Sequence, residues 1–173
     1  MESFLTKLKD ITTFIFDVDG VLTDGTVFVT ETGVQSRAFN IKDGYALQLA
    51  VKSGYNVAAI SGSRSKSALF RLNSLGITDV YLGAHTKSER FKLYIEEKNI
   101  HPSTILYMAD DIPDLAAMKL VGMPVCPADA AEEIKAICSY ISPIPGGRGC
   151  VREVIEKVMK VQGTWMNEQA YSW

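Results

Sequence analysis

The sequence predicts an α/β fold in which helices cover both faces of a parallel sheet. Three observations support this prediction. Short runs rich in β-branched and aromatic residues alternate with segments of helical periodicity, as in proteins built from βαβ units. Most of these runs are continuously apolar, which is expected of strands that are buried on both faces. Polar residues typical of active sites follow several of the runs directly.

The predicted strands are five of these apolar runs, at residues 13–16, 57–60, 80–82, 105–108 and 124–125. The segments with helical character are 45–52, 66–75, 88–98, 115–121, 131–140 and 150 to about 161. In the third of them, Phe91, Tyr94 and Ile95 recur at helical spacing while charged residues occupy the other positions, which favours an amphipathic helix. Residues 26–39 interrupt the alternation, because two β-forming runs flank Glu31-Thr32-Gly33. We therefore predict a β-hairpin directly after the first strand.

Length and composition limit the domain organisation and the class of partner. A chain of 173 residues with 47% apolar residues has the size of one domain with one core. We expect a single domain over 1–173, with the hairpin inserted at 26–39 and a tail at about 164–173. The formal charge of −2, with both signs interspersed, gives no reason to expect nucleic acid or an anionic membrane as a partner. No apolar stretch approaches the roughly 20 residues of a membrane span, and the three cysteines have no paired spacing. With no signal peptide in the sequence, we expect a cytoplasmic protein with reduced thiols and a small-molecule partner.

Four sets of polar residues fall at the ends of predicted strands, which is where open parallel sheets bind ligands. In chain order these sets are Asp17 with Asp19, Ser61 with Gly62, Lys87, and Asp110 with Asp111. Each set alone has a common structural explanation, such as a turn, a helix cap or a solvated lysine. The presence of all four in one chain indicates a single active site.

The chemistry that suits this set is phosphoryl transfer through a covalent intermediate. Clustered carboxylates repel one another, and Mg²⁺, which prefers oxygen ligands, relieves the repulsion. Asp17 would then attack phosphorus to give an aspartyl-phosphate, while Ser61 and Lys87 would bind the phosphate oxygens. Asp19 would protonate the leaving alcohol and later deprotonate the hydrolytic water. The metal ligands expected from the pattern are Asp17, Asp110 and Asp111.

The motif Asp17-Val18-Asp19-Gly20, followed in order by Ser61, Lys87 and Asp110-Asp111, resembles the haloacid dehalogenase superfamily of phosphohydrolases. The resemblance implies a Rossmann-like three-layer fold, the roles given above, and the main-chain carbonyl of Asp19 as a further Mg²⁺ ligand. Members of this superfamily usually carry a cap domain between their motifs. In this chain those intervals leave room only for the hairpin and ordinary βα units, so we expect an open site without a cap.

Three segments, 19–25, 39–44 and 146–153, are similar to phosphatases of 3-deoxy-D-manno-octulosonate 8-phosphate, a phosphorylated eight-carbon sugar acid of lipopolysaccharide biosynthesis. This resemblance implies a capless homotetramer whose hairpins form a central barrel and whose active sites are completed by a neighbouring subunit. An exposed apolar hairpin by itself also favours self-association. The tetrapeptide Ser61-Gly62-Ser63-Arg64 departs from the Gly-Arg dipeptide that is common in the group. A related nine-carbon 2-keto-3-deoxy sugar acid 9-phosphate therefore stays open as the substrate.

A sugar acid carries a carboxylate besides its phosphate, and cationic side chains would recognise both. The candidate substrate-binding residues are Gly62, Arg64, Arg71, Arg148, Lys42 and Asp43. For Arg71 a structural role within its helix is equally open, and for Lys42 and Asp43 a role at the start of a helix is equally open.

Two other functions stay open. A signalling receiver would be phosphorylated on an aspartate without turnover, but that aspartate would follow a middle strand rather than the first one. A non-catalytic oligomerisation or regulatory module would have no use for Asp19 or Lys87.

Overall fold

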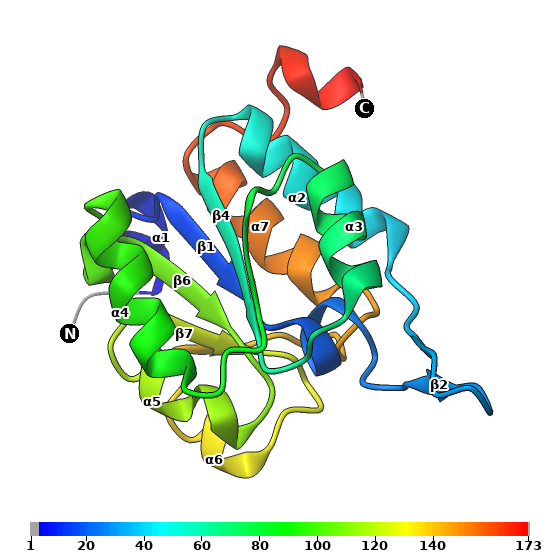
Figure 1. Cartoon of the computed structure of the whole chain (residues 1–173). Helices are drawn as coiled ribbons and strands as arrows, with labels where there is room; N and C mark the ends of the chain where they lie inside the picture. The colour runs from blue at the N-terminus through cyan, green and yellow to red at the C-terminus, as the bar shows by residue number, and fades with distance from the viewer. Residues whose placement is uncertain (1–3, 173) are drawn as a thin grey trace.

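The computed structural model describes residues 4–172, in which six parallel strands form one sheet in the order β5-β4-β1-β6-β7-β8 (Figure 1). The strands are β1 (Thr13–Phe16), β4 (Asn56–Ser61), β5 (Asp79–Leu82), β6 (Ile105–Met108), β7 (Met123–Cys126) and β8 (Tyr140–Ile141). The first strand lies in the middle and pairs with β4 on one side and with β6 on the other. The strand order therefore reverses at β1, and in such sheets ligands bind at the point of reversal.

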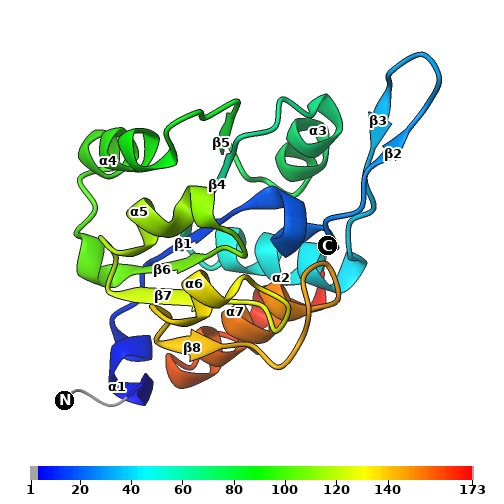
Figure 2. The same ribbon diagram turned by 90° about the horizontal axis from the view of Figure 1, so that it is seen from below.

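Helices cover both faces of the sheet, so the predicted three-layer α/β architecture is confirmed. They are α1 (Phe4–Lys9), α2 (Ile41–Lys52), α3 (Lys66–Ser74), α4 (Lys87–Lys98), α5 (Leu115–Met118), α6 (Glu132–Lys135) and α7 (Cys150–Val161). Alternate residues of β1 point to opposite faces, as in any strand. Phe14 and Phe16 join the core under α2, α3 and α7, whereas Ile15 joins the core under α4, α5 and α6. Figure 2 shows the two helical layers on either side of the sheet.

Three helix boundaries differ by more than one residue from those that the sequence predicted. The helix expected at 131–140 ends at Lys135, because Tyr140–Ile141 pairs with β7 as the edge strand β8. The helix expected at 45–52 begins at Ile41, where the Asn40 side chain accepts hydrogen bonds from the next turn and acts as the N-cap. The helix expected at 115–121 ends at Met118. The helix α1 was not predicted from the sequence.

The predicted hairpin is present as β2 (Phe28–Val29) and β3 (Gln35–Ser36), which pair antiparallel. It extends away from the body of the protein (Figure 2). Its apolar side chains face solvent within one chain, with Phe28 and Val29 each 63% exposed. In the described part of the chain, the intervals between the sheet strands hold this hairpin and short helical segments, in agreement with the capless architecture expected from the sequence.

The segment after α7 folds back onto α2. Trp165 is buried and meets Tyr45 edge to face, with ring centroids 6.2 Å apart, and Asn167 donates a hydrogen bond to Ser53. The three cysteines are free thiols. No helix in residues 4–172 combines the length and the apolar content that crossing a membrane requires.

Candidate active site

A cavity of about 270 Å³ lies at the carboxyl edge of the sheet, beside the ends of β1 and β6. Its lining residues are Asp17, Asp19, Gly20, Gly25, Asp110, Asp111, Pro113 and Asp114. The nucleophile candidate Asp17 is fixed there because its backbone N–H donates to the Met108 carbonyl at 3.0 Å, which extends the β1–β6 pairing by one residue. The fold thus brings together the two aspartate pairs that the sequence analysis singled out, although about 90 residues separate them in the chain.

The chain after Asp17 makes a tight turn that Thr23 holds in place. The Thr23 hydroxyl accepts hydrogen bonds from the N–H groups of Gly20 (3.4 Å) and Gly25 (3.3 Å). Gly20 has φ +85°, and a Cβ atom there would lie 2.0 Å from Oδ2 of Asp110. Only glycine meets both conditions, so this residue allows Asp110 to approach the turn.

The late segment 146–149 packs backbone to backbone against this turn. Gly147 donates its N–H to the Val21 carbonyl at 2.8 Å, and a Cβ atom on Gly146 would lie only 1.9 Å from the Gly20 carbonyl oxygen. Arg148 extends outward and pairs with Asp24 at 3.0 Å. The glycines of this segment, which the sequence analysis noted through a resemblance, therefore support the loop that carries the candidate nucleophile.

Lys87, the first residue of α4, lies between two buried carboxylates. Its Nζ is 2.8 Å from Oδ1 of Asp17 and 2.6 Å from Oδ2 of Asp114, and the Tyr107 hydroxyl donates to the other oxygen of Asp114 at 2.8 Å. Asp114 and Tyr107 were not among the site residues predicted from the sequence. The available signals were the position of Asp114 four residues after Asp110 and the single hydroxyl group in the apolar run 105–108.

The charges in this cluster do not balance. Burial raises the pKa of Asp17 more than Lys87 lowers it. Burial and then the neighbouring Asp17 raise the pKa values of Asp110 and Asp114 to about 7 each. Burial lowers the pKa of Lys87, but Asp17 and Asp114 together raise it by more, so the ammonium group stays charged. The buried Asp17 and Asp114 and the half-buried Asp110 thus have one neighbouring cation, Lys87, and the site favours additional positive charge.

The donor set fits a hard divalent cation. Oδ1 of Asp110 is buried and has no hydrogen-bond partner among the described residues, which is unfavourable unless a further group binds it. The Asp111 carboxylate is different, because it is exposed and accepts the N–H of Ile112 at 2.8 Å. In residues 4–172 no three Asp, Glu, His or Cys side chains form a complete metal site. Side chains would therefore supply only part of a coordination shell, as is usual for Mg²⁺, which keeps several of its waters.

The remaining two catalytic candidates also lie at this edge. Ser61 ends β4, next to β1, and its buried hydroxyl accepts the N–H of Ser63 at 3.1 Å. The side chain of Asp19 is 33% exposed and pairs with Arg37, a residue that the sequence analysis did not select. No sequence signal identified Arg37, because it lies in the hairpin arm and reaches Asp19 only in the folded chain.

The candidate substrate-binding residues are dispersed within one chain, and none of the six lines the carboxylate cavity. Arg64 packs over Gly83. Arg71 lies against Gly44 between α2 and α3. Asp43 is buried in the first turn of α2, and its Oδ1 accepts the N–H of Arg152 at 2.7 Å.

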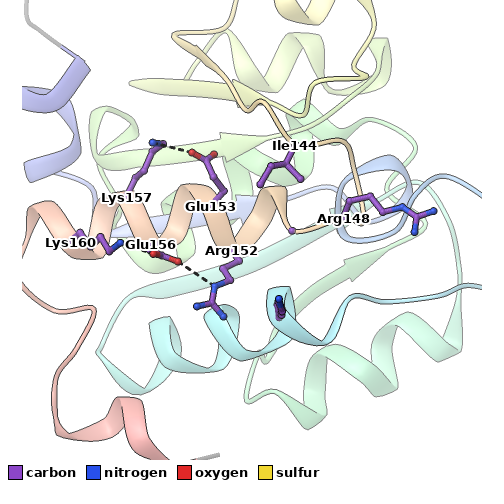
Figure 3. Close-up of a pocket in the computed structure, with 9 residues that line it drawn as sticks. Ile144, Arg148, Arg152, Glu153, Glu156, Lys157 and Lys160 are labelled. Atoms are coloured by element: carbon purple, nitrogen blue, oxygen red, sulfur yellow. Dashed lines mark hydrogen bonds and ion pairs between the residues drawn. The ribbon is translucent and has the colours of Figure 1, made fainter.

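Lys42 and Arg148 instead border a second cavity of about 470 Å³. It runs along α7, whose Arg152, Lys157 and Lys160 line it together with Glu153 and Glu156 (Figure 3). Most of these charges are already paired, for example Lys157 with Glu153 at 3.1 Å and Lys160 with Glu156 at 2.6 Å. The lining has five cationic side chains and two carboxylates, so its excess of charge is positive, whereas the site at the end of β1 has an excess of carboxylates.

Comparison with known proteins finds relatives of the same name by sequence and by structure. No family model matches the chain. The 3-deoxy-D-manno-octulosonate 8-phosphate phosphatase of Salmonella typhi is 38% identical over 159 residues, which cover 92% of this chain and 85% of that protein. The crystal structure of the phosphatase of the same name from Yersinia pestis is 34% identical, with a TM-score of 0.92 over 94% of this chain and 88% of that one. That from Moraxella catarrhalis, in complex with magnesium, phosphate and 3-deoxy-D-manno-octulosonate (KDO), is 34% identical, with a TM-score of 0.89 over 92% of this chain and 91% of that one.

Proposed function

Because the chain belongs to the family of 3-deoxy-D-manno-octulosonate 8-phosphate phosphatases, within the haloacid dehalogenase superfamily, we propose that it hydrolyses this sugar acid phosphate with Mg²⁺ as cofactor. The observation that carries the proposal is the cavity at the end of β1, where the buried Asp17 and Asp114 share the Lys87 ammonium group and the half-buried Asp110 lies beside them. Such a site suits a divalent cation together with a phosphate monoester. The magnesium and phosphate bound to the Moraxella catarrhalis relative support the same chemistry.

The residues that would hold the metal are Asp17 and Asp110, with the main-chain carbonyl of Asp19 as a third ligand that family membership implies. The unpartnered Oδ1 of Asp110 is available for this role. Asp111 was expected among the ligands, and its contact with the N–H of Ile112 favours a supporting position at the turn. When bound, Mg²⁺ supplies positive charge that offsets the phosphate and the clustered carboxylates.

The proposed reaction has two steps, both on Asp17. Val18 and Lys87 bind Oδ1 of Asp17, which leaves Oδ2 to attack phosphorus and form an aspartyl-phosphate. Asp19 gives a proton to the departing sugar alkoxide. Asp19 then takes a proton from a water molecule, which attacks the phosphoryl group, frees inorganic phosphate and restores Asp17. Lys87 and the Ser61 hydroxyl stabilise the phosphate oxygens during both transfers.

Recognition of the sugar acid requires groups beyond this cavity. Arg64, Arg71, Arg148 and Lys42 are the cations proposed for the substrate carboxylate and hydroxyls, and within one chain they lie away from the carboxylate cavity. We therefore propose that a neighbouring subunit completes the site in a homotetramer held together through the hairpins. The exposed Phe28 and Val29 support an apolar contact at that position. Family membership also implies that the product enters lipopolysaccharide biosynthesis in the cytoplasm.

The test of the function is phosphate release from a panel of sugar phosphates with and without Mg²⁺. We expect Mg²⁺-dependent release from the eight-carbon sugar acid 8-phosphate and slower release from the nine-carbon 9-phosphate. Asp17→Asn should abolish release, because an amide does not attack phosphorus. Asp10→Asn, at an exposed carboxylate beside α1, is the matched control and should be fully active. Activity in the Asp17→Asn enzyme would refute the mechanism, and a preference for the nine-carbon substrate would reassign the enzyme within its class.

The test of the assembly is the molecular mass in solution by light scattering. The double variant Phe28→Ser with Val29→Ser should dissociate the tetramer and lower activity toward the sugar acid. Leu93→Ser is the control, because this side chain is 50% exposed on α4. A tetramer that survives the hairpin double variant would contradict the proposed assembly.

A further inference from the structure

Arg37 lies one residue beyond β3, in the arm that connects the hairpin to α2, yet its side chain reaches the carboxyl edge of the sheet. Its Nε donates to Oδ1 of Asp19, and its Nη2 donates to Oδ2 of the same carboxylate at 3.2 Å. The guanidinium therefore binds the Asp19 carboxylate in bidentate fashion, through one hydrogen bond to each oxygen. Arginine can make this pair of contacts and lysine cannot.

A third contact fixes the arginine itself. Nη2 of Arg37 also donates to the Ser63 hydroxyl at 3.0 Å, and Ser63 belongs to the loop that follows β4. The Arg37 side chain is only 4% exposed, against 33% for Asp19, and Arg37 is not among the residues that line the carboxylate cavity. The guanidinium thus lies behind Asp19 rather than in the space that a substrate would occupy.

The burial of Arg37 is unfavourable for stability in one respect. Its Nη1 is buried and has no hydrogen-bond partner among the described residues. Leaving a buried donor of a charged group unpaired is destabilising, so stability alone does not explain why this arginine is inside the protein. Its two bonds to Asp19 point to a role in the reaction.

We propose that Arg37 is a positioning residue that fixes the plane of the Asp19 carboxylate for proton transfer to and from the reacting phosphate ester. The inference rests on the proposed function, in which Asp19 is the acid and base. A carboxylate held at both oxygens cannot rotate about its terminal bond, so its direction relative to Asp17 is set before substrate binds. Because Arg37 belongs to the hairpin arm, the base of the hairpin is also part of the active site.

The test combines steady-state kinetics with a double-mutant cycle. We expect Arg37→Ala to lower kcat toward the sugar phosphate about 100-fold, the size of loss that misplacing a reacting group by about 1 Å can cause, with KM changed less than about twofold. Arg37→Lys should restore only part of kcat, because one ammonium group cannot make both bonds. Arg90→Ala is the matched control, since Arg90 also forms an ion pair but stacks over Tyr81 away from the site.

The cycle uses 4-nitrophenyl phosphate, whose leaving group departs without a proton, so that variants at Asp19 stay measurable. Arg37→Ala should lower turnover in the wild-type background, where Asp19 still activates water, and should cause no further loss in the Asp19→Ala background. A loss of equal size in both backgrounds would mean that Arg37 acts independently of Asp19, and unchanged kcat in Arg37→Ala would also overturn the proposal. If Asp17→Asn remains active, the proposed function itself fails. If Asp17→Asn is inactive while Arg37→Ala is normal, only this inference fails.

Discussion

The packing of segment 146–149 against the nucleophile loop predicts that Gly146→Ala damages catalysis without removing any reacting group. The added Cβ would lie 1.9 Å from the Gly20 carbonyl oxygen, whereas Cβ atoms essentially never approach another heavy atom closer than 3.0 Å. One of the two loops must therefore move by about 1 Å, and misplacement by this distance can lower a rate about 100-fold. Overpacking of this kind also destabilises a protein by about 1–3 kcal/mol. The assays are kcat with saturating substrate and Mg²⁺, and urea unfolding.

Gly122→Ala is the matched control for this prediction. A Cβ atom there would lie 2.2 Å from the Ser103 carbonyl oxygen, which is again a clash with backbone, but neither Gly122 nor Ser103 lines the carboxylate cavity. We expect a similar loss of stability from Gly122→Ala and an unchanged kcat. The reasoning is refuted if Gly146→Ala keeps normal kcat, or if the two variants lose kcat equally.

Three further predictions concern single carboxylates. Asp114→Asn removes the charge that holds Lys87 and should cost about 1.5–3 kcal/mol of transition-state stabilisation, seen as a lower kcat/KM and weaker inhibition by phosphate; unchanged values of both contradict this role. Burial raises the pKa of Asp43 from 3.8 to about 6, so the folded state retains a proton that the unfolded state has lost. The stabilisation that the protonated Asp43 carboxyl gives to the folded state is complete below pH 3.8 and is lost as the pH rises through 6. Relative to Asp43→Asn, the wild type should therefore lose about 2.4 kcal/mol of unfolding free energy between pH 4 and 7, and parallel urea-unfolding profiles would exclude the effect. Mg²⁺ should raise the melting temperature of the wild type but not of Asp110→Asn, and an equal rise in both would show that Asp110 does not hold the metal.

The sequence was sufficient to predict the architecture and most of the site, because both depend on local signals. The central strands are continuous apolar runs, and the polar residues that end them were predicted to meet because the carboxyl ends of parallel strands share one edge. The hairpin could be predicted because residues 26–39 combine two β-forming runs with a turn between them. These signals lie in residues that are adjacent in the sequence, so they can be recognised without knowledge of the tertiary structure.

The remaining features depend on contacts between distant segments. Arg37 and Asp114 take their roles from partners 18 and 27 residues away. Nothing in the sequence around Arg37 distinguishes it from an ordinary surface charge, and the position of Asp114 four residues after Asp110 is only a weak signal. The helix predicted at 131–140 failed for the same reason. Its alanine-rich start favours a helix, but Tyr140 and Ile141 pair with β7 at the edge of the sheet. Pairing between distant segments thus outweighs local propensity.

The central position of β1 has a consequence for how the protein is made. Asp17 is synthesised before every segment that supports it, because its strand pairs with residues 56–59 and 105–108 and its loop rests on Gly146 and Gly147. About 130 residues separate Asp17 from that support, which corresponds to on the order of ten seconds of translation. During this time the apolar first strand has no complete sheet to join, and we expect it to depend on chaperones or on compact intermediates. A chain truncated before residue 146 would contain every proposed catalytic residue and still lack an ordered nucleophile.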